Sequence, residues 1–288
     1  MNGEIHLRDV KPVLHLTLQS CLHLAVIAAI FLIFLLASCT TVPLTGRSGL
    51  SLVPDSQIVT MSYQQYSEVL KKSKLSNNQE KVQMVRRVGG RIAMAAESFL
   101  KESGAGADVA LYKWEFNLIE DDKVVNAWCM PGGKVAVYTG ILPIAKDETG
   151  LAVVVGHEVA HAIAKHGNER MSQALLVQLG GIGLSAALST QAAATQELFL
   201  QLYGVGANVG YMLPYSRLHE NEADRIGLVL MAKAGYDPRA AVGLWQRMNS
   251  QSSGRTLEFL STHPAPATRV ANIEALIPEA MRYYQKPR

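Results

Sequence analysis

HEVAH, at residues 157–161, is the motif from which the architecture of this 288-residue chain can be predicted. Residues four apart on a helix lie about 40° apart around its axis, so His157 and His161 project from one face and can hold one zinc ion. Glu158 follows the first histidine and can act as general base toward a water at the metal. The spacing therefore predicts a catalytic zinc site on a helix.

The residues around this motif predict a buried helix. Residues 151–164 are mostly apolar, which makes such a helix apolar nearly all round. Asp147 is a plausible N-cap, and we expect the helix to run to His166 with Gly167 as its stop. His166 would then lie on the face opposite to His157, so we predict that it is solvated or caps the helix and is not a ligand.

The segment SRLHENEAD, at residues 216–224, offers a further ligand on a second predicted helix. Catalytic zinc usually takes three protein ligands and leaves one position for water. Glu220 and Asp224 share a face, so Glu220 can ligate while Asp224 accepts a hydrogen bond from the other nitrogen of a ligating histidine. Glu222 points nearly the other way, and we predict that it is solvated. The expected ligands of one zinc ion per chain are His157, His161 and Glu220.

The two motifs together carry a family resemblance. HEVAH followed by SRLHENEAD resembles the zinc peptidase family that includes the CAAX prenyl protease and the mitochondrial Oma-type proteases, and within it the periplasmic BepA-like branch. The family's ligating glutamate falls on Glu220. The resemblance implies a gluzincin fold of the α+β class, mainly α. Its expected parts are a central HExxH helix, a small sheet whose edge strand binds extended substrate, and a helical surround.

The same resemblance extends to the region expected to bind substrate. Residues 126–140 look like the family's edge-strand region, which implies that substrate is added to the sheet there as a further strand. The match consists of Asn126-Ala127, Pro131-Gly132-Gly133 and residues 137–140, and the residues expected at the substrate edge are Asn126, Ala127, Gly132 and Gly133. The dipeptide Trp128-Cys129 departs from the pattern, because relatives often carry smaller or more apolar residues there.

A late element of the family also has a counterpart. Residues 261–264, with Arg269 beyond them, are similar to its SHPxxxxR element. The resemblance implies that His263 approaches the active site as a catalytic residue. It would either stabilise the oxyanion or occupy the open position of the zinc as a removable fourth ligand, and the sequence leaves both roles open. We expect Arg217 and Arg269 to form structural ion pairs rather than to touch substrate.

The beginning of the sequence has the features of an export signal. Arg8 and Lys11 precede an apolar run at residues 22–37, which is marginal for crossing a bilayer and about right for a secretory signal. The run ends in Leu36-Ala37-Ser38-Cys39, which resembles a bacterial lipoprotein signal, so we expect a lipid on Cys39. The alternative is an N-terminal membrane anchor that is never cut.

This reading divides the chain into three parts. They are a signal peptide at residues 1–38, a tether at 39–55 and a zinc metallopeptidase domain at 56–288. The tether is predicted because its Pro, Gly, Ser and Thr residues follow no periodicity. Loss of Cys21 with the signal and lipidation of Cys39 would leave only Cys129, so no intramolecular disulfide is expected.

Periodicity predicts the remaining elements. Helices are expected at 56–72, 78–103, 216–234, 238–250 and after Pro266, and strands at 114–119 and 134–139. Residues 171–213 are rich in Ala, Leu and Gly, but glutamines and a glutamate interrupt them. Buried or membrane-surface helices are therefore favoured there over membrane spans. The net charge of +3 is spread without a long Lys/Arg run, so nucleic acid is not an expected partner.

These observations predict a zinc-dependent metalloendopeptidase. Its expected substrates are unfolded or misassembled envelope polypeptides, which it would clear in protein quality control. We expect it to be exported, to face the periplasm and to be held on a bacterial membrane by its lipid, with the outer membrane favoured over the inner one. The alternative is a chaperone-like or scaffold lipoprotein that binds zinc and cleaves rarely. An intramembrane prenyl-protein protease is disfavoured because clean spanning segments are missing.

Overall fold

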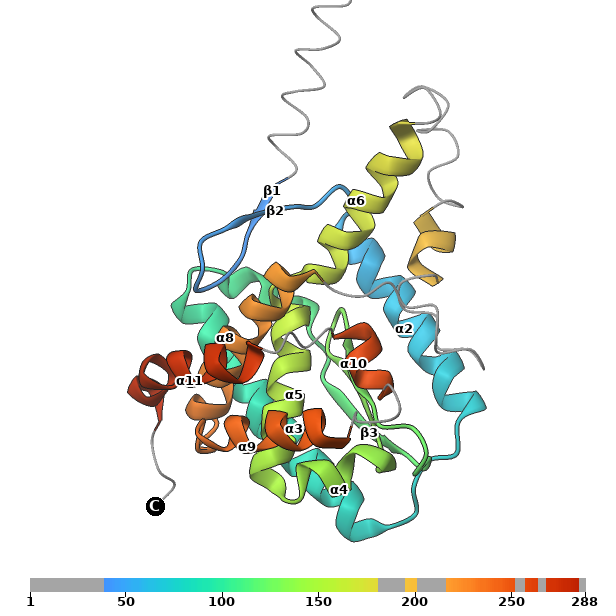
Figure 1. Cartoon of the computed structure of the whole chain (residues 1–288). Coiled ribbons are helices and arrows are strands. Elements are labelled where there is room, and N and C mark those ends of the chain that lie inside the picture. Colours follow the sequence, from blue (N-terminus) through green and yellow to red (C-terminus); the bar gives the residue numbers. More distant parts are fainter. Residues whose placement is uncertain (1–38, 181–194, 201–215, 252–256, 264–267, 285–288) are drawn as a thin grey trace, which may run out of the picture.

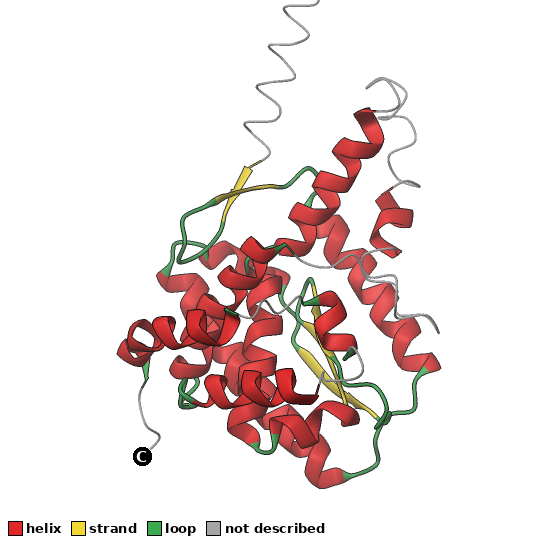
Figure 2. Ribbon diagram, viewed as in Figure 1, coloured by secondary structure: helices red, strands yellow, loops and turns green. Residues whose placement is uncertain are grey.

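The computed structural model describes residues 39–180, 195–200, 216–251, 257–263 and 268–284. Helices dominate this part of the chain and surround a small sheet, as Figure 2 shows. The α+β, mainly α class expected from the sequence is therefore confirmed. The main helices are α2 (Asp55–Lys72), α3 (Gln79–Glu102), α4 (Leu142–Ala145), α5 (Glu148–Ile163), α6 (His166–Gly180), α8 (Arg217–Lys233), α9 (Ala240–Gln251), α10 (Glu258–Thr262) and α11 (Arg269–Ala280). Most lie within a few residues of their predicted bounds, and the two short helices α4 and α10 had no counterpart in the prediction.

The helix that carries HEVAH lies at the centre of the molecule (Figure 1). In α5, every residue from Gly150 to Ile163 is buried, and the Asp147 side chain caps its first turn by accepting from the Gly150 amide. α5 packs against α3, α8, α9 and the sheet. Its closest approach is to α8, where a Cβ added at Gly227 would lie 3.0 Å from the backbone nitrogen of His157. Glycine at this crossing lets the two motif-bearing helices come together.

The central helix ends earlier than the sequence suggested. α5 stops at Ile163, and Lys165 adopts a left-handed conformation with φ of +57°. The next helix, α6, begins at His166 and runs in a different direction, so Gly167 lies in its first turn and does not act as a stop. The Lys165 ammonium pairs with Asp55 and Asp108 at 2.8 Å each, which holds the turn in place. The predicted continuous helix from 147 to 166 is wrong for this reason.

The main sheet has three strands in the order β3-β5-β4. β3 (Glu115–Ile119) runs parallel to β5 (Lys134–Tyr138), and β4 (Ala127–Met130) runs antiparallel to β5. The tight turn from β4 to β5 contains Gly132 and Gly133, both with φ near +80°. An added Cβ at either glycine would collide with Tyr63 or Trp114, so this turn requires glycine. β4 is thus an edge strand of this sheet, in the region where the sequence placed the edge.

The segment expected to be a tether is instead folded onto the domain. β1 (Cys39–Thr41) pairs antiparallel with β2 (Ser48–Leu50), and we call residues 39–53 the N-terminal hairpin. Val42 and Val53 of the hairpin are buried. The Leu52 amide donates to the Ser172 hydroxyl on α6 at 2.8 Å. Figure 1 shows the hairpin lying across the molecule beside α6.

Within the described residues, none of the helices is long and apolar enough to cross a bilayer. The apolar run at 22–37 lies outside this part of the chain, as do 181–194 and 201–213 of the Ala-, Leu- and Gly-rich segment. Of the remainder of that segment, Met171, Leu175 and Phe199 pack together in the interior. These three residues fit the buried alternative of the prediction, whereas Val177 on α6 is 81% exposed.

Candidate metal centre

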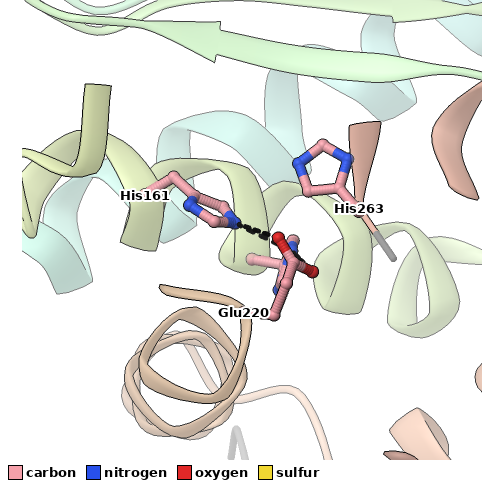
Figure 3. A group of neighbouring side chains, drawn as sticks. His161, Glu220 and His263 are labelled. Carbon is pink, nitrogen blue, oxygen red and sulfur yellow. Dashed lines mark hydrogen bonds and ion pairs between the residues drawn. The ribbon is translucent and has the colours of Figure 1, made fainter. Parts of the chain in front are cut away.

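Four buried side chains converge beside α5 and form the only group in the described residues that could hold a metal ion. His157 and His161 come from α5, Glu220 from the first turn of α8, and His263 from the residue that ends α10. One ligand atom of each lies within 4.8 Å of the others. Figure 3 shows Glu220 facing His161, with His263 approaching from another side. The structure therefore brings together all three predicted ligands and the residue whose role was left open.

The donor atoms of this group have the spacing that zinc requires. Two donors on a tetrahedral zinc ion, each about 2.0–2.1 Å from it, lie roughly 3.3 Å apart. The Nε2 atoms of His157 and His161 are 3.1 Å apart. His161 Nε2 lies 3.2 Å from Glu220 Oε1, and His157 Nε2 lies 3.5 Å from Glu220 Oε2. Both Glu220 oxygens are buried and accept no hydrogen bond of good geometry. A set of two imidazoles and one carboxylate at this spacing fits zinc.

A buried ion pair between Asp224 and Arg269 contacts the ligands His157 and Glu220. His157 Nδ1 lies 3.0 Å from Asp224 Oδ1, as the sequence predicted for the partner of a ligating histidine. Arg269 donates to both Asp224 oxygens at 2.9 and 2.7 Å and lies 2.8 Å from Glu220 Oε2. Its guanidinium also lies 3.5 Å from the centre of the Trp245 ring. Arg269 forms the ion pairs that were expected, but it is only 1% exposed and lies next to the metal centre.

These charges shift the acid–base properties of the centre. Burial alone would lower the pKa of His157, but hydrogen bonds to Asp224 and Glu220 outweigh it and raise the pKa to about 9. Burial also opposes ionisation of Asp224, and the positive charge of Arg269 nevertheless holds its pKa below the usual value. Burial raises the pKa of Glu158 to about 8 in the metal-free protein. A dication nearby would favour the carboxylate form of Glu158, which is the form that accepts a proton.

Glu158 lies between the metal ligands and the sheet. One of its oxygens, Oε1, is buried, accepts no hydrogen bond and lies 3.5 Å from His263 Nε2. A hydrogen bond from the Cys129 backbone amide lowers the pKa of Glu158, though less than burial raises it. The general-base candidate is therefore in contact with β4, the edge strand.

The pairing of β4 identifies the groups on its open edge. The Tyr138 amide donates to the Asn126 carbonyl, and hydrogen-bonded positions alternate along an antiparallel pair. Ala127 and Cys129 therefore direct their backbone groups away from β5. The Asn126 side chain accepts from the Ala127 amide at 2.9 Å and donates to Glu258 on α10 at 3.0 Å. Of the predicted edge residues, Asn126 and Ala127 lie at this edge, while Gly132 and Gly133 form the turn beyond it.

His263 is held by the short helix that the sequence did not predict. Its Nδ1 lies 3.2 Å from the Phe259 carbonyl and 2.8 Å from the Thr262 hydroxyl, and its ring stacks on Phe259 with centroids 4.5 Å apart. The Phe259 amide in turn donates to the Val125 carbonyl just before β4. Burial lowers the pKa of His263 to about 3.

Two predictions near the centre are wrong. His166 was expected to be solvated or to cap a helix, and Glu222 to be solvated, yet both are buried. The turn at Lys165 brings His166 back against His161, with their Nδ1 atoms 2.9 Å apart. Glu222 points away from Glu220 as expected, but it lies 2.7 Å from Arg47 of the N-terminal hairpin instead of facing solvent.

Comparison of the sequence with known proteins identifies a family that contains this centre. The sequence matches "Peptidase family M48" over residues 89–277, which is well over half of the chain. Mitochondrial metalloendopeptidase OMA1 of Schizosaccharomyces pombe is 42% identical over 183 residues, 63% of this chain and 52% of that protein. Human metalloendopeptidase OMA1 is 30% identical over 262 residues, 88% of this chain and 48% of its own.

A bacterial relative aligns over a similar length. The beta-barrel assembly-enhancing protease of Escherichia coli is 27% identical over 270 residues, 92% of this chain and 52% of its own. The chain thus spans about half the length of these relatives. The predicted membership of a zinc peptidase family is confirmed, whereas the narrower assignment to the periplasmic branch stays a prediction. With both motifs inside the matched region and their side chains gathered at one centre, the chain belongs to peptidase family M48.

Proposed function

We propose that this chain is an endopeptidase that uses one zinc ion to hydrolyse peptide bonds in exported proteins. The observation that carries the proposal is the position of Glu158. It is buried beside the three-residue donor set on one side and the open edge of β4 on the other. A centre that only held a structural zinc ion would not need an unpaired carboxylate oxygen next to a strand edge.

The roles of the residues follow from their positions. His157, His161 and Glu220 would hold the zinc ion, and Asp224 would orient His157. Zinc supplies Lewis acidity and lowers the pKa of water to about 7. Glu158 Oε1 accepts a proton from the attacking water and passes it to the leaving nitrogen. Substrate lies along β4 as an added strand, paired with the backbone carbonyls of Ala127 and Cys129, because the amides of these residues already donate to Asn126 and Glu158.

The position of His263 favours one of its two open roles. A carbonyl oxygen only accepts hydrogen bonds, so the contact with Phe259 is made when Nδ1 carries the proton. In the neutral ring, Nε2 then has a lone pair directed at the cluster. This supports His263 as a removable fourth ligand over a donor to the oxyanion. The same observation supports the second candidate function, a zinc-bound chaperone-like lipoprotein with low or gated proteolysis, because a fourth ligand displaces water.

For the setting of the reaction, we propose a periplasm-facing enzyme held by a lipid on Cys39, on the outer membrane in preference to the inner one. The sequence at residues 36–39 supports this proposal. Misassembled envelope polypeptides are the proposed substrates, in protein quality control. The name of the Escherichia coli relative, a beta-barrel assembly-enhancing protease, supports the same setting.

Metal removal tests the proposed activity. The full chain, purified in detergent, should contain one zinc per chain by elemental analysis and should cleave casein. A chelator should abolish cleavage, and stoichiometric zinc should restore it, because the donor set provides one site. Cleavage that persists in metal-free protein would rule out zinc catalysis. One bound zinc without any cleavage would favour the low-activity alternative.

The lipid anchor has its own test. Cys39→Ser should accumulate as a precursor that retains residues 1–38, since lipid attachment and cleavage both require the thiol. Each buried CH₂ of an acyl chain contributes about 0.8 kcal/mol, so the parent chain should remain with membranes after a salt wash. Metabolic labelling with a fatty-acid analogue measures the modification. Unlabelled parent protein that keeps residues 1–38 would support the uncut anchor.

A further inference from the structure

The two histidines of HEVAH are held from behind by different partners. His157 Nδ1 faces a carboxylate directly, at 3.0 Å from Asp224. His161 Nδ1 instead faces another imidazole, that of His166, at 2.9 Å. The other nitrogen of His166 lies 3.2 Å from Glu222 Oε2. The imidazole of His166 thus lies between the ligand His161 and the carboxylate of Glu222.

The hydrogen-bond chemistry of this chain fixes where the protons lie. A carboxylate only accepts, so His166 Nε2 carries a proton and donates it to Glu222. The neutral His166 ring then offers a lone pair at Nδ1, and His161 must donate from its own Nδ1. His161 Nε2 is left with its lone pair directed at Glu220 and His157, where the metal binds. The reverse arrangement would place a proton on the ligating nitrogen.

Arg47 of the N-terminal hairpin fixes the acceptor end of this chain. Its guanidinium donates to both oxygens of Glu222 at 2.7–3.0 Å and to both oxygens of Glu169 on α6 at 2.7–2.8 Å. The Thr45 hydroxyl adds a hydrogen bond to Glu222 Oε1 at 2.7 Å. Glu222 therefore accepts hydrogen bonds from two side chains of the hairpin, Arg47 and Thr45. These bonds hold its carboxylate in place as an acceptor oriented toward His166.

We propose that His166, Glu222 and Arg47 form a positioning relay that presents the Nε2 lone pair of His161 to the metal, and that the N-terminal hairpin is thereby part of the metal centre. The relay rests on the proposed function only for the identity of the ligands. None of its three members touches substrate. They act through His161, and their effect should therefore be measured in metal binding before activity.

Two substitutions at His166 separate positioning from packing. In His166→Leu an apolar side chain fills the space but accepts no hydrogen bond, whereas His166→Asn keeps an oxygen that can accept from His161. Zinc affinity of the full chain in detergent, measured by competition with a chromophoric chelator, should fall about 10- to 100-fold in His166→Leu. His166→Asn should retain most of the affinity, and the visible spectrum of cobalt-substituted protein should change only in His166→Leu. Equal affinities and spectra in the two folded variants would overturn the relay.

A second pair of variants tests the hairpin and covers the case in which His166→Leu does not fold. Arg47→Gln removes the clamp on Glu222 and should weaken zinc binding by about 10-fold, the low end of the same range. Glu279→Gln is the matched control, because it breaks the ion pair between Glu279 on α11 and Arg225 on α8, the helix that carries Glu222, away from the ligands, and should leave affinity unchanged. Identical affinities in these two variants would contradict the role of Arg47. These experiments measure zinc binding and not cleavage. A parent chain that binds zinc without cleaving casein would therefore refute the proposed function, while the variants would still test the relay.

Discussion

Glu158→Gln should retain the fold and the zinc ion and lose proteolysis. Glutamine has nearly the same shape as glutamate but cannot accept a proton from the attacking water. General-base assistance is typically worth 10² to 10⁴ in rate, so casein cleavage should fall by about that factor. Zinc content and the thermal midpoint should match those of the parent. The comparison of cleavage rate with zinc content on the same preparation is the decisive measurement.

A glutamate at the start of the same helix provides the control. Glu148 is on α5 and pairs at the surface with Arg87, so Glu148→Gln changes the charge of the helix without touching the centre. It should cleave casein at the parent rate. Glu158→Gln should also retain uncleaved substrates, which crosslinking can identify. If Glu158→Gln fully rescues the envelope defects of a deletion strain, proteolysis is not the main duty and the chaperone-like function is correct.

Arg269→Leu should cause the largest loss of stability. Arg269 is buried and is paired with Glu220 at 2.8 Å and with Asp224 at 2.7 Å. Without it, two buried carboxylates lack their positive partner. Removing one member of a buried ion pair costs about 3–5 kcal/mol, because the remaining charge stays desolvated. Denaturant titration in the presence of a chelator should show a loss of this size in the free energy of unfolding.

The matched comparison is a half-exposed ion pair on the same two helices. Arg225 and Glu279 lie 2.8 Å apart, with side-chain exposures of 36% and 28%. Arg225→Leu should cost only about 0–1 kcal/mol, as surface pairs do. Added zinc should reduce the loss in Arg269→Leu, since the ion places positive charge beside Glu220. Similar losses for Arg225→Leu and Arg269→Leu would show that Arg269 does not balance the carboxylates of the centre.

The ligands could be predicted because helical periodicity is local. HEVAH places two histidines on one face, and the spacing of Glu220 and Asp224 does the same on α8. Both statements depend only on residues within a single turn of each other. The structure accordingly places these four side chains together. His263 could be placed near the centre only through its family resemblance, since no pattern predicted α10.

The relay could not be predicted from the sequence. Lys165 adopts a left-handed conformation although it is neither glycine nor asparagine, so nothing in the sequence signals that the helix ends before His166. Periodicity gave the direction of Glu222 correctly. The error lay in assuming that solvent was on that side, because Arg47 is 175 residues away in the sequence. The sequence of the hairpin resembles a tether because few of its residues are apolar. Val42 and Val53 are buried, and Arg47 holds the hairpin to the domain through ion pairs with Glu169 and Glu222.

The placement of Arg269 has a consequence for when the metal centre can form during synthesis. Arg269 contacts His157, which lies 112 residues earlier in the sequence, and Arg47 contacts Glu222, which lies 175 residues later. Contacts between such distant segments form late in folding, because the loop-closure entropy must be overcome before they are made. A nascent chain that ends before Arg269 already contains all four donors of the centre but lacks the counter-charge for Glu220 and Asp224. A growing chain therefore cannot assemble a charge-balanced metal centre before almost all of the described fold has been synthesised.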